Sequence, residues 1–416
     1  MNYFLPHVKI VCPGSTWNGV TTNLRFSKSN LIAIGNSVTS KEGDQILEEG
    51  LMISPGWVEL RAKFYDPGFP EKEDLKSGTQ AAALGGYTHV GALPHGSPCL
   101  DNRTGVRYLL EKSKNLPSKV LPIGSLSAGM QGKEMAELND LKQAGCVAFS
   151  DGGLPIADTV FLKTALQYAS STDSVVFIRP DDAFLSKYGD VREGIHSTLA
   201  GIQSTPEFSE TIGIERIARI IEYTNCKVHL TSISTISGLE VLKSLKEKGL
   251  PITADVSVAH LLFNDKEILD YDSNFKLSPP LGNEETQKKL IDAVKSGLID
   301  VVSSDHDPQE IESKQCEFHL AKPGISSIQA SFSLLLEAIP SLPEERIVEL
   351  LSSNPRNILQ MGSPQFIEGE KSDYTLFQPK DSTFYSRANW ASNSENFPKL
   401  GTELNGKVIM TVIHIT

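Results

Sequence analysis

The sequence lacks the features of a membrane protein or of a secreted, disulfide-bonded protein. It contains no uninterrupted run of the roughly 18 apolar residues that a membrane-spanning helix requires. Residues 1–14 show no basic segment followed by a long apolar core, so no signal peptide is expected. The five cysteines are dispersed and form no C-x-x-C pair, which is typical of free thiols in a reducing compartment. We therefore expect a cytoplasmic protein.

Positive charge is also scarce. The chain has 39 lysines and arginines against 51 acidic residues, which gives a net charge of −12. Nucleic acid and anionic membranes would repel such a chain, so neither is expected as its main partner. A length of 416 residues with 39% hydrophobic and 22% charged residues suits a globular protein with one large domain and a smaller accessory domain.

Eight short apolar runs dominate the middle of the chain. Between most of them the apolar residues recur at helical spacing, as in 237–249, where Gly249 is suited to cap the end of the helix. Strands that alternate with helices predict a parallel sheet, and eight such units predict an α/β fold with a closed (β/α)₈ barrel. Functional residues of such barrels lie at the carboxyl ends of the strands. The eight runs are 57–63, 87–93, 120–126, 146–150, 174–180, 227–233, 251–257 and 299–305.

The two ends of the chain differ from this middle part. Short β-like runs at 3–11 and 31–34 are broken by Gly, Asn and Ser, and an alternating β-rich run closes the chain at 407–416. We predict that residues 1–54 and 366–416 together form a small β-sandwich domain, and that residues 55–365 form the barrel.

Several ordered motifs carry a family resemblance. The segment 54–68, S-P-G-W-V-E-L-R-A-K-F-Y-D-P-G, resembles the pattern P-G-x-x-D-x-H-x-H-x-R-E-P-G of the first barrel strand of dihydroorotases. The segments 77–88, 149–153 (F-S-D-G-G) and 304–308 (S-D-H-D-P) are similar to three further motifs of that family, and Lys314, Phe318, 323–325 and 354–356 follow at the expected spacing. The chain is therefore identified as resembling the longer, bacterial type of dihydroorotase in the amidohydrolase superfamily. The resemblance implies a barrel with a β-sandwich and, in active members, bound zinc.

The chain departs from the family pattern where that pattern places metal ligands. The resemblance assigns six former ligand positions, of which only Asp151 and Asp305 still carry a ligating side chain; the other four are Arg61, Lys63, Arg179 and Ser232. Ammonium and guanidinium groups are cations without a free lone pair and cannot bind zinc. We predict that the chain binds no metal or other cofactor. We expect the three cations to replace the metal charge and to pair with Asp151 and Asp305.

The positions that the family uses to hold its substrate are changed as well. The resemblance places Tyr65, His95 and Gln309 at these positions, where the family has arginine, asparagine and histidine. Asp305, the general base of active relatives, is then a relic of the catalytic site. These changes favour a catalytically inactive, pseudoenzyme member of pyrimidine biosynthesis that acts as a structural partner. Because inactive homologues serve as scaffolds for aspartate transcarbamoylase, that enzyme is the expected partner, and a homo-oligomer is expected too.

Two other functions stay open. The chain could be an active cyclic-amide hydrolase of the dihydroorotase or allantoinase type with an atypical site. It could also be a small-anion binding protein built around Arg61, Lys63 and Arg179.

Simple structural roles are expected for the polar residues nearby. His95 is expected to be a loop residue without a role, and His229 to pack beneath the site because it points away from Ser232 on alternating strand positions. His306 is expected only to orient Asp305. The pair 181–182 is expected to be a solvated acidic surface.

Overall fold

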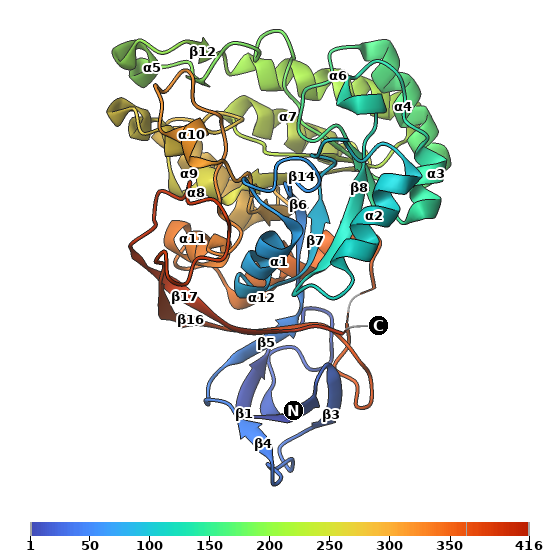
Figure 1. Cartoon of the computed structure of the whole chain (residues 1–416), viewed down its shortest axis with the longest axis vertical. Helices are drawn as coiled ribbons and strands as arrows, with labels where there is room; N and C mark the ends of the chain where they lie inside the picture. Colours follow the sequence, from blue (N-terminus) through green and yellow to red (C-terminus); the bar gives the residue numbers. More distant parts are fainter. Residues whose placement is uncertain (1, 363, 415–416) are drawn as a thin grey trace.

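The computed structural model describes residues 2–362 and 364–414. Its central element is a parallel, nearly closed barrel whose strands follow the order β15-β14-β13-β10-β9-β8-β7-β6, with β15 returning to lie beside β6 (Figure 1). All eight predicted strands are present, and the predicted fold class is confirmed. The strands are β6 (Trp57–Ala62), β7 (Tyr87–Ala92), β8 (Lys119–Gly124), β9 (Ala148–Ser150), β10 (Val176–Ile178), β13 (Val228–Leu230), β14 (Ile252–Ser257) and β15 (Val301–Ser303).

Helices connect the strands and cover the outside of the barrel. Polar caps start several of them: the Asp74 carboxylate accepts a hydrogen bond from the Ser77 amide at the start of α1, and Thr235 does the same for Gly238 at the start of α7. The helix predicted at 237–249 is α7, which ends at Glu247; Gly249 then has a φ of +76°, which suits glycine where the chain leaves a helix. The helices are α1 (Leu75–Leu84), α2 (Arg103–Ser113), α3 (Leu138–Ala144), α4 (Thr159–Ser171), α5 (Ile195–Ala200), α6 (Phe208–Thr224), α7 (Ile236–Glu247), α8 (Val258–Leu262), α9 (Glu284–Ser296), α10 (Ile311–Lys314), α11 (Ser331–Ala338), α12 (Glu344–Val348) and α13 (Asn354–Ile358).

Both ends of the chain contribute to a second sheet below the barrel (Figure 1). Its order is β17-β16-β5-β1-β2-β3, with β4 beside β1, and the antiparallel pairing of β5 with β16 joins the two ends. The predicted 407–416 run falls on β17, which starts four residues earlier; residues 415–416 lie outside the described residues. The strands are β1 (Asn2–Ile10), β2 (Thr21–Ser27), β3 (Asn30–Ile34), β4 (Asp44–Ile46), β5 (Met52–Pro55), β16 (Tyr374–Phe384) and β17 (Glu403–Val412). The short pair β11 (Val191–Arg192) and β12 (Ser204–Thr205) lies apart from both sheets.

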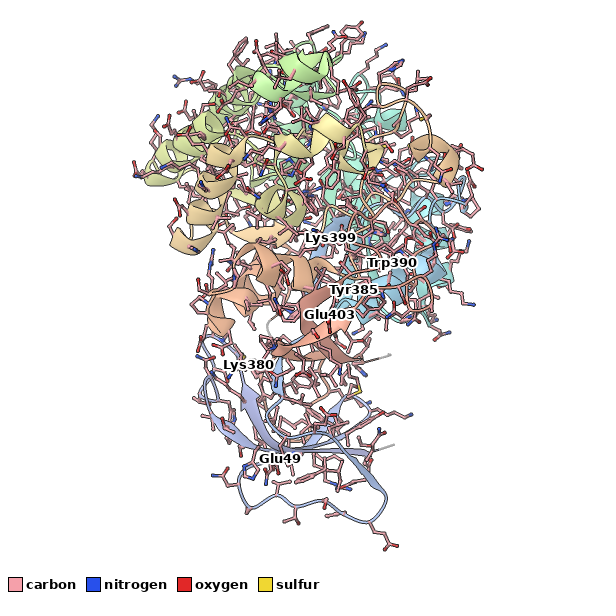
Figure 2. All side chains as sticks on the ribbon, turned by 90° about the vertical axis from the view of Figure 1, so that its left-hand side faces the viewer. Glu49, Lys380, Tyr385, Trp390, Lys399 and Glu403 are labelled. Atoms are coloured by element: carbon pink, nitrogen blue, oxygen red, sulfur yellow. The ribbon has the colours of Figure 1, made fainter. Side chains whose placement is uncertain are left out.

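One part of the C-terminal region leaves this sheet. Between β16 and β17 the chain packs against the barrel, where Tyr385 and Phe397 belong to the barrel core and Trp390 stacks on Phe397 at a centroid distance of 4.8 Å. Figure 2 shows Tyr385 and Trp390 beside the barrel, whereas Glu49 lies in a turn beside the second sheet, at the other end of the molecule. Residues 385–402, which we assigned to the β domain, therefore pack against the barrel.

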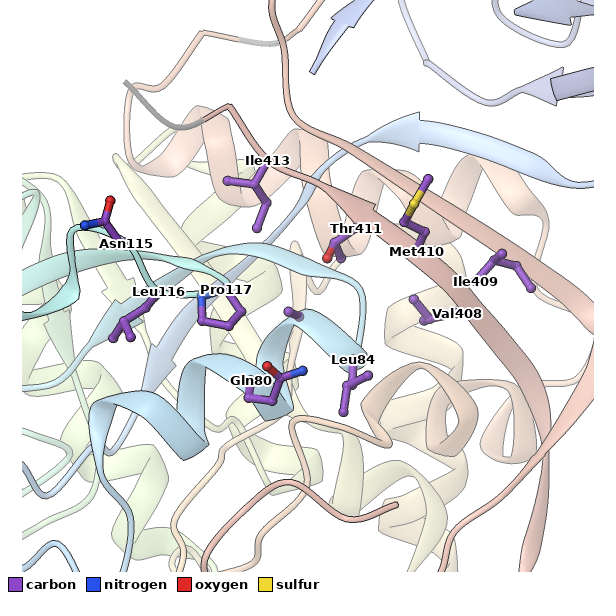
Figure 3. A pocket seen from close by; sticks show the side chains of 11 residues that line it. Gln80, Leu84, Asn115, Leu116, Pro117, Val408, Ile409, Met410, Thr411 and Ile413 are labelled. Carbon is purple, nitrogen blue, oxygen red and sulfur yellow. The ribbon is translucent and has the colours of Figure 1, made fainter. Parts of the chain in front are cut away.

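Aromatic packing joins the barrel to the second sheet. The Trp57 ring at the start of β6 lies 5.0 Å from that of Phe332 and 5.3 Å from that of Phe377 on β16. Gly86, with a φ of +95°, lets the ring approach, since a Cβ there would lie 2.5 Å from Trp57. Farther along the same junction, a cavity of about 410 Å³ separates α1 from β17, with Leu84 and Val408 on its walls (Figure 3).

Two further properties follow from the described residues. The five cysteines are all unpaired, as predicted from their dispersion. None of the described helices combines the length and the apolar character needed to cross a membrane.

Candidate functional site

Arg61 lies at the centre of the barrel mouth. Its guanidinium donates to both carboxylate oxygens of Asp255, at 2.9 and 2.8 Å, and to the Ser232 hydroxyl at 2.7 Å. It also forms an ion pair with Asp305. One side chain from β6 thus joins β14 to the ends of β13 and β15. The expected pairing of Arg61 with Asp305 is confirmed.

Asp255 is the buried counter-charge of Arg61. It also accepts hydrogen bonds from the Ser232 amide at 2.8 Å and contacts His229 Nε2 at 3.0 Å. Burial by itself would raise the pKa of Asp255, but the charge and hydrogen bonds of Arg61 outweigh it and hold that pKa well below its usual range. The same contacts raise the pKa of Arg61 although its burial acts to lower it. Both groups are therefore charged at neutral pH.

The backbone at the strand ends directs side chains towards Arg61. Ser232 and Asp305, which follow β13 and β15, have φ angles of +55° and +53°. This left-handed conformation is uncommon for residues with a side chain and costs roughly 1 kcal/mol or more. The hydrogen bonds and the ion pair to Arg61 help to hold it.

A second cluster forms around Asp307, beside the first. Lys63 Nζ lies 2.6 Å from Asp307, and Tyr65 donates to the same carboxylate at 2.6 Å. Gln309 donates to Asp307 at 2.8 Å. Burial, followed by the neighbouring Asp307, raises the pKa of Tyr65, so this phenol is neutral. Three predicted site residues therefore meet at a carboxylate to which we had assigned no role.

Two expected ion pairs are wrong. Lys63 pairs with Asp307, and Arg179 pairs with Asp181 at 2.7 Å, because each cation finds a closer carboxylate than Asp151 or Asp305. Asp181 is consequently buried, with 2% exposure, and is not the solvated surface residue that we expected.

Asp151 is held by neutral groups. It accepts hydrogen bonds from the Leu126 and Ser127 amides and from the Ser125 and Ser127 hydroxyls, at 2.6–3.1 Å. Burial nevertheless raises its pKa, since no cation among the described residues is paired with it. Asp151 is therefore separated from the Arg61 cluster.

The three histidines near the site have different surroundings. His229 is fully buried and bonded to Asp255 and Thr253; it packs within the barrel as expected, but it shares Asp255 with Ser232 and does not point away from that residue. His306 contacts Glu73 at 3.2 Å and accepts from the Ser327 amide, so the expectation that it orients Asp305 is wrong. His95 is half-buried rather than a free loop residue: its ring lies 5.9 Å from that of Tyr65 and over Gly152.

The residues present do not fit a zinc site. Such a site needs three or four ligating nitrogen, sulfur or oxygen atoms around one point. Here Asp305 is bound to Arg61 and Asp307 to Lys63 and Tyr65, and the cavity between these groups measures only about 140 Å³. Within residues 2–362 and 364–414, no group of three or more His, Cys, Asp or Glu side chains is arranged to hold a metal ion. Nor do Arg61, Lys63 and Arg179 resemble an anion-binding site, because each of these cations already has a carboxylate partner.

The sequence contained signals for the two carboxylates that we missed. Asp255 is a charged residue within the apolar strand run 251–257, and such a residue needs a buried partner. Asp307 stands two residues after Asp305, a spacing that can bring both side chains to one side of an extended segment. Neither signal identifies the partner.

Comparisons with known proteins agree on one family. The family model described as Dihydro-orotase-like matches residues 50–237. Curated dihydroorotases are similar over most of their length: that of Aquifex aeolicus is 36% identical, with 91% of this chain and 90% of the relative covered. That of Syntrophus aciditrophicus is 30% identical, with 99% and 98% covered.

Solved structures show the same fold at lower identity. The L-hydantoinase (dihydropyrimidinase) of Arthrobacter aurescens superposes with a TM-score of 0.85 at 17% identity, with 98% of this chain and 94% of that chain covered. The dihydropyrimidinase of Brevibacillus agri superposes with a TM-score of 0.83 at 17% identity, with 99% and 94% covered.

Proposed function

Since the chain belongs to the dihydroorotase family of the amidohydrolase superfamily, we propose that it serves pyrimidine biosynthesis as a catalytically inactive member. One observation carries the proposal. The Arg61 guanidinium occupies a position that the family pattern gives to a metal ligand, and it is bound to Asp255, Asp305 and Ser232 at once. A cation held at this point by two carboxylates takes the place of a metal centre.

The chemistry of the family explains why this change should abolish turnover. Hydrolysis or closure of a cyclic amide requires an activated water, a polarised carbonyl and a general base. Asp305, the residue at the position of the base, is tied to Arg61, so it would have to break a partly buried ion pair before it could accept a proton. Tyr65 stands where the family holds its substrate with an arginine, and its hydroxyl is committed to Asp307.

A combined assay tests inactivity. We expect no turnover of dihydroorotate or carbamoyl-aspartate in either direction and no metal above background by elemental analysis, with a dihydroorotase of demonstrated activity assayed in parallel as the positive control. Turnover that disappears in Asp305→Ala would overturn the proposal, and so would nearly one metal ion per chain bound beside Asp305. Allantoin should be tested as well, because an active hydrolase with an atypical site is the remaining alternative.

We further propose that the chain acts as a structural partner, with aspartate transcarbamoylase as the partner and a homo-oligomer as its own state. The support is analogy with inactive members of the family, together with a barrel core that is complete although the site is changed. Sedimentation of the chain with the transcarbamoylase of the same organism should show a complex at micromolar concentration. Two independently sedimenting species, with the transcarbamoylase fully active alone, would contradict this role without affecting the proposal of inactivity.

A further inference from the structure

A second cavity lies outside the barrel mouth, between the segment that follows β6, the β7–α2 connection and helix α2. Its volume is about 440 Å³, against about 140 Å³ for the space between the charged residues of the mouth. Phe64 and Asp66 line it, whereas Lys63 lines the mouth, because successive residues of an extended segment point to opposite sides. The cavity is therefore a neighbour of the mouth, with Leu93 in the wall between them, and neither Arg61, Lys63 nor Asp307 lines it.

We propose that this cavity binds a compact, uncharged small molecule that has a flat apolar ring and one hydrogen-bonding group. The inference is independent of the catalytic state of the barrel and goes beyond the proposed function. No residue of the Arg61 cluster takes part in it.

The size and lining of the cavity support a small apolar ligand. A volume of this order lies within the roughly 300–1,000 Å³ that is typical of small-molecule sites, which are mostly apolar with a few polar groups. The wall is made of apolar side chains, chiefly Phe64, Leu93, Pro94, Leu100 and Leu109. Ala92, Gly96 and Gly105 are also part of the wall, and their small size leaves the space open. Apolar surface left in contact with water is unfavourable, and a ligand would cover it.

The charges at the rim explain why the ligand should be uncharged. The Asp66 carboxylate is neutralised by Lys112, whose Nζ lies 2.7 and 2.6 Å from its two oxygens, and it also accepts a hydrogen bond from Tyr108 at 3.1 Å. No unpaired charge lines the cavity among the described residues. A charged ligand would lose hydration there without gaining a partner.

His95 supplies the hydrogen-bonding group. Its imidazole lines the cavity; Nδ1 is closed off and has no hydrogen-bond partner within the described part of the chain, so Nε2 is the ring nitrogen left for a ligand. Burial, followed by the charge of Lys63, lowers the pKa of His95 to about 3, so the ring is neutral at physiological pH. A neutral imidazole leaves one hydrogen bond for a hydroxyl or ring N–H of the ligand.

Titration calorimetry with 2-naphthol as the probe tests the proposal on the full chain. We expect one binding site per chain, with 2-naphthoate at least tenfold weaker because its carboxylate finds no partner. Thr104→Trp, an exposed substitution on α2 that projects a large ring from the cavity wall, should weaken 2-naphthol at least tenfold. Arg107→Trp, exposed on the same helix but outside the cavity, is the matched control and should bind like the unmodified chain. His95→Leu should weaken binding roughly fivefold, the effect of one neutral hydrogen bond.

Several results would overturn the proposal. These are no binding of 2-naphthol at millimolar concentration, equal binding of 2-naphthoate, or equal loss in Thr104→Trp and Arg107→Trp. A dimer that dissociates only in Thr104→Trp would show that a second copy of the chain fills the cavity, and this too would contradict a small-molecule site.

Discussion

Arg61 shows how a single side chain can take over the organisation of a barrel mouth. A guanidinium is planar and carries five donors, so it can bind two carboxylates and a hydroxyl at once. In the barrel these partners are Asp255, Asp305 and Ser232, and the side chain of Arg61 is almost completely buried. Such a network keeps Asp255 charged, and it makes each partner dependent on the others.

Removal of the Arg61 side chain should therefore destabilise the folded protein strongly. In Arg61→Ala the buried Asp255 loses its counter-charge, and we expect the free energy of unfolding in urea to fall by about 3–5 kcal/mol. The control is Arg103→Ala, which breaks the Arg103–Asp140 pair, whose side chains are 37% and 44% exposed; because solvent screens this pair, the free energy of unfolding should change little. An equal loss of unfolding free energy in the two variants would show that the ion pairs of Arg61 stabilise the protein no more than an exposed ion pair does.

Buried histidines should make the protein less stable in mild acid. Burial lowers the pKa of His89 and His95 to about 3 and that of His260 to about 4. The unfolded chain takes up protons on these residues below about pH 6.5, whereas the folded chain does not, so stability is complete above pH 6.5 and falls as the pH drops.

Urea unfolding between pH 6.5 and 4.5 measures this effect. We expect a loss of up to about 1.4 kcal/mol per pH unit for each histidine, and His89→Gln should reduce the slope by up to this amount. A stability that is constant across this range would show that these histidines are protonated in the folded protein.

At the scale of elements, the segment between β16 and β17 is attached to the barrel by a few polar contacts. Asn396 accepts a hydrogen bond from the Gln309 amide at 3.1 Å, donates to the Asp307 carbonyl at 3.2 Å, and its own carbonyl accepts from the Ser326 amide. These bonds connect the C-terminal region to the loop that carries Asp307, and thus to the Lys63 and Tyr65 cluster. Residues 385–402 therefore support the barrel mouth from outside the barrel.

Truncation of Asn396 should loosen this attachment. Asn396→Ala leaves the buried Gln309 amide without a partner, which should cost about 1–3 kcal/mol. Hydrogen exchange should become faster in 386–402 and around residue 309. Asn393→Ala removes an exposed side chain that donates only to the Pro70 carbonyl, and it should leave exchange unchanged at residue 309. Unchanged exchange in both variants would mean that aromatic packing alone holds the segment.

At the scale of the whole molecule, the barrel and the second sheet share a core. Trp57 belongs to the first barrel strand and Phe377 to a strand of the second sheet, and their rings are 5.3 Å apart. The pairing of β5 with β16 connects the same two regions through the backbone. Two parts that share buried aromatic surface and a sheet should unfold together.

Calorimetry tests this cooperativity. We expect a single unfolding transition, and Phe377→Ala should lower its stability by about 3–5 kcal/mol through the cavity that it creates. Phe384→Ala, at the 54% exposed end of the same strand, is the matched control and should change little. Two resolved transitions, of which only one moves in Phe377→Ala, would contradict a shared core.

The sequence by itself determined the barrel, and its resemblance to the family pattern implied the changed ligand positions. Eight apolar runs in alternation with helical segments allow few other folds, because each strand and helix can be recognised from its own residues. The resemblance to the family pattern implies that Arg61, Lys63 and Arg179 stand at positions of ligand histidines, and the chemistry of each side chain then shows that these three residues cannot bind zinc.

Only the tertiary structure decided which carboxylate each cation meets. Arg61 and Asp255 are 194 residues apart in the chain, and Lys63 and Asp307 are 244 apart. Such pairs form because the closed barrel brings the ends of distant strands to one place, and no local pattern records which of several acidic residues will be closest. The same reason explains why residues 385–402 pack against the barrel. The aromatic residues of this segment could have covered either the barrel or the second sheet, and in the folded chain Tyr385 and Phe397 are buried in the barrel core.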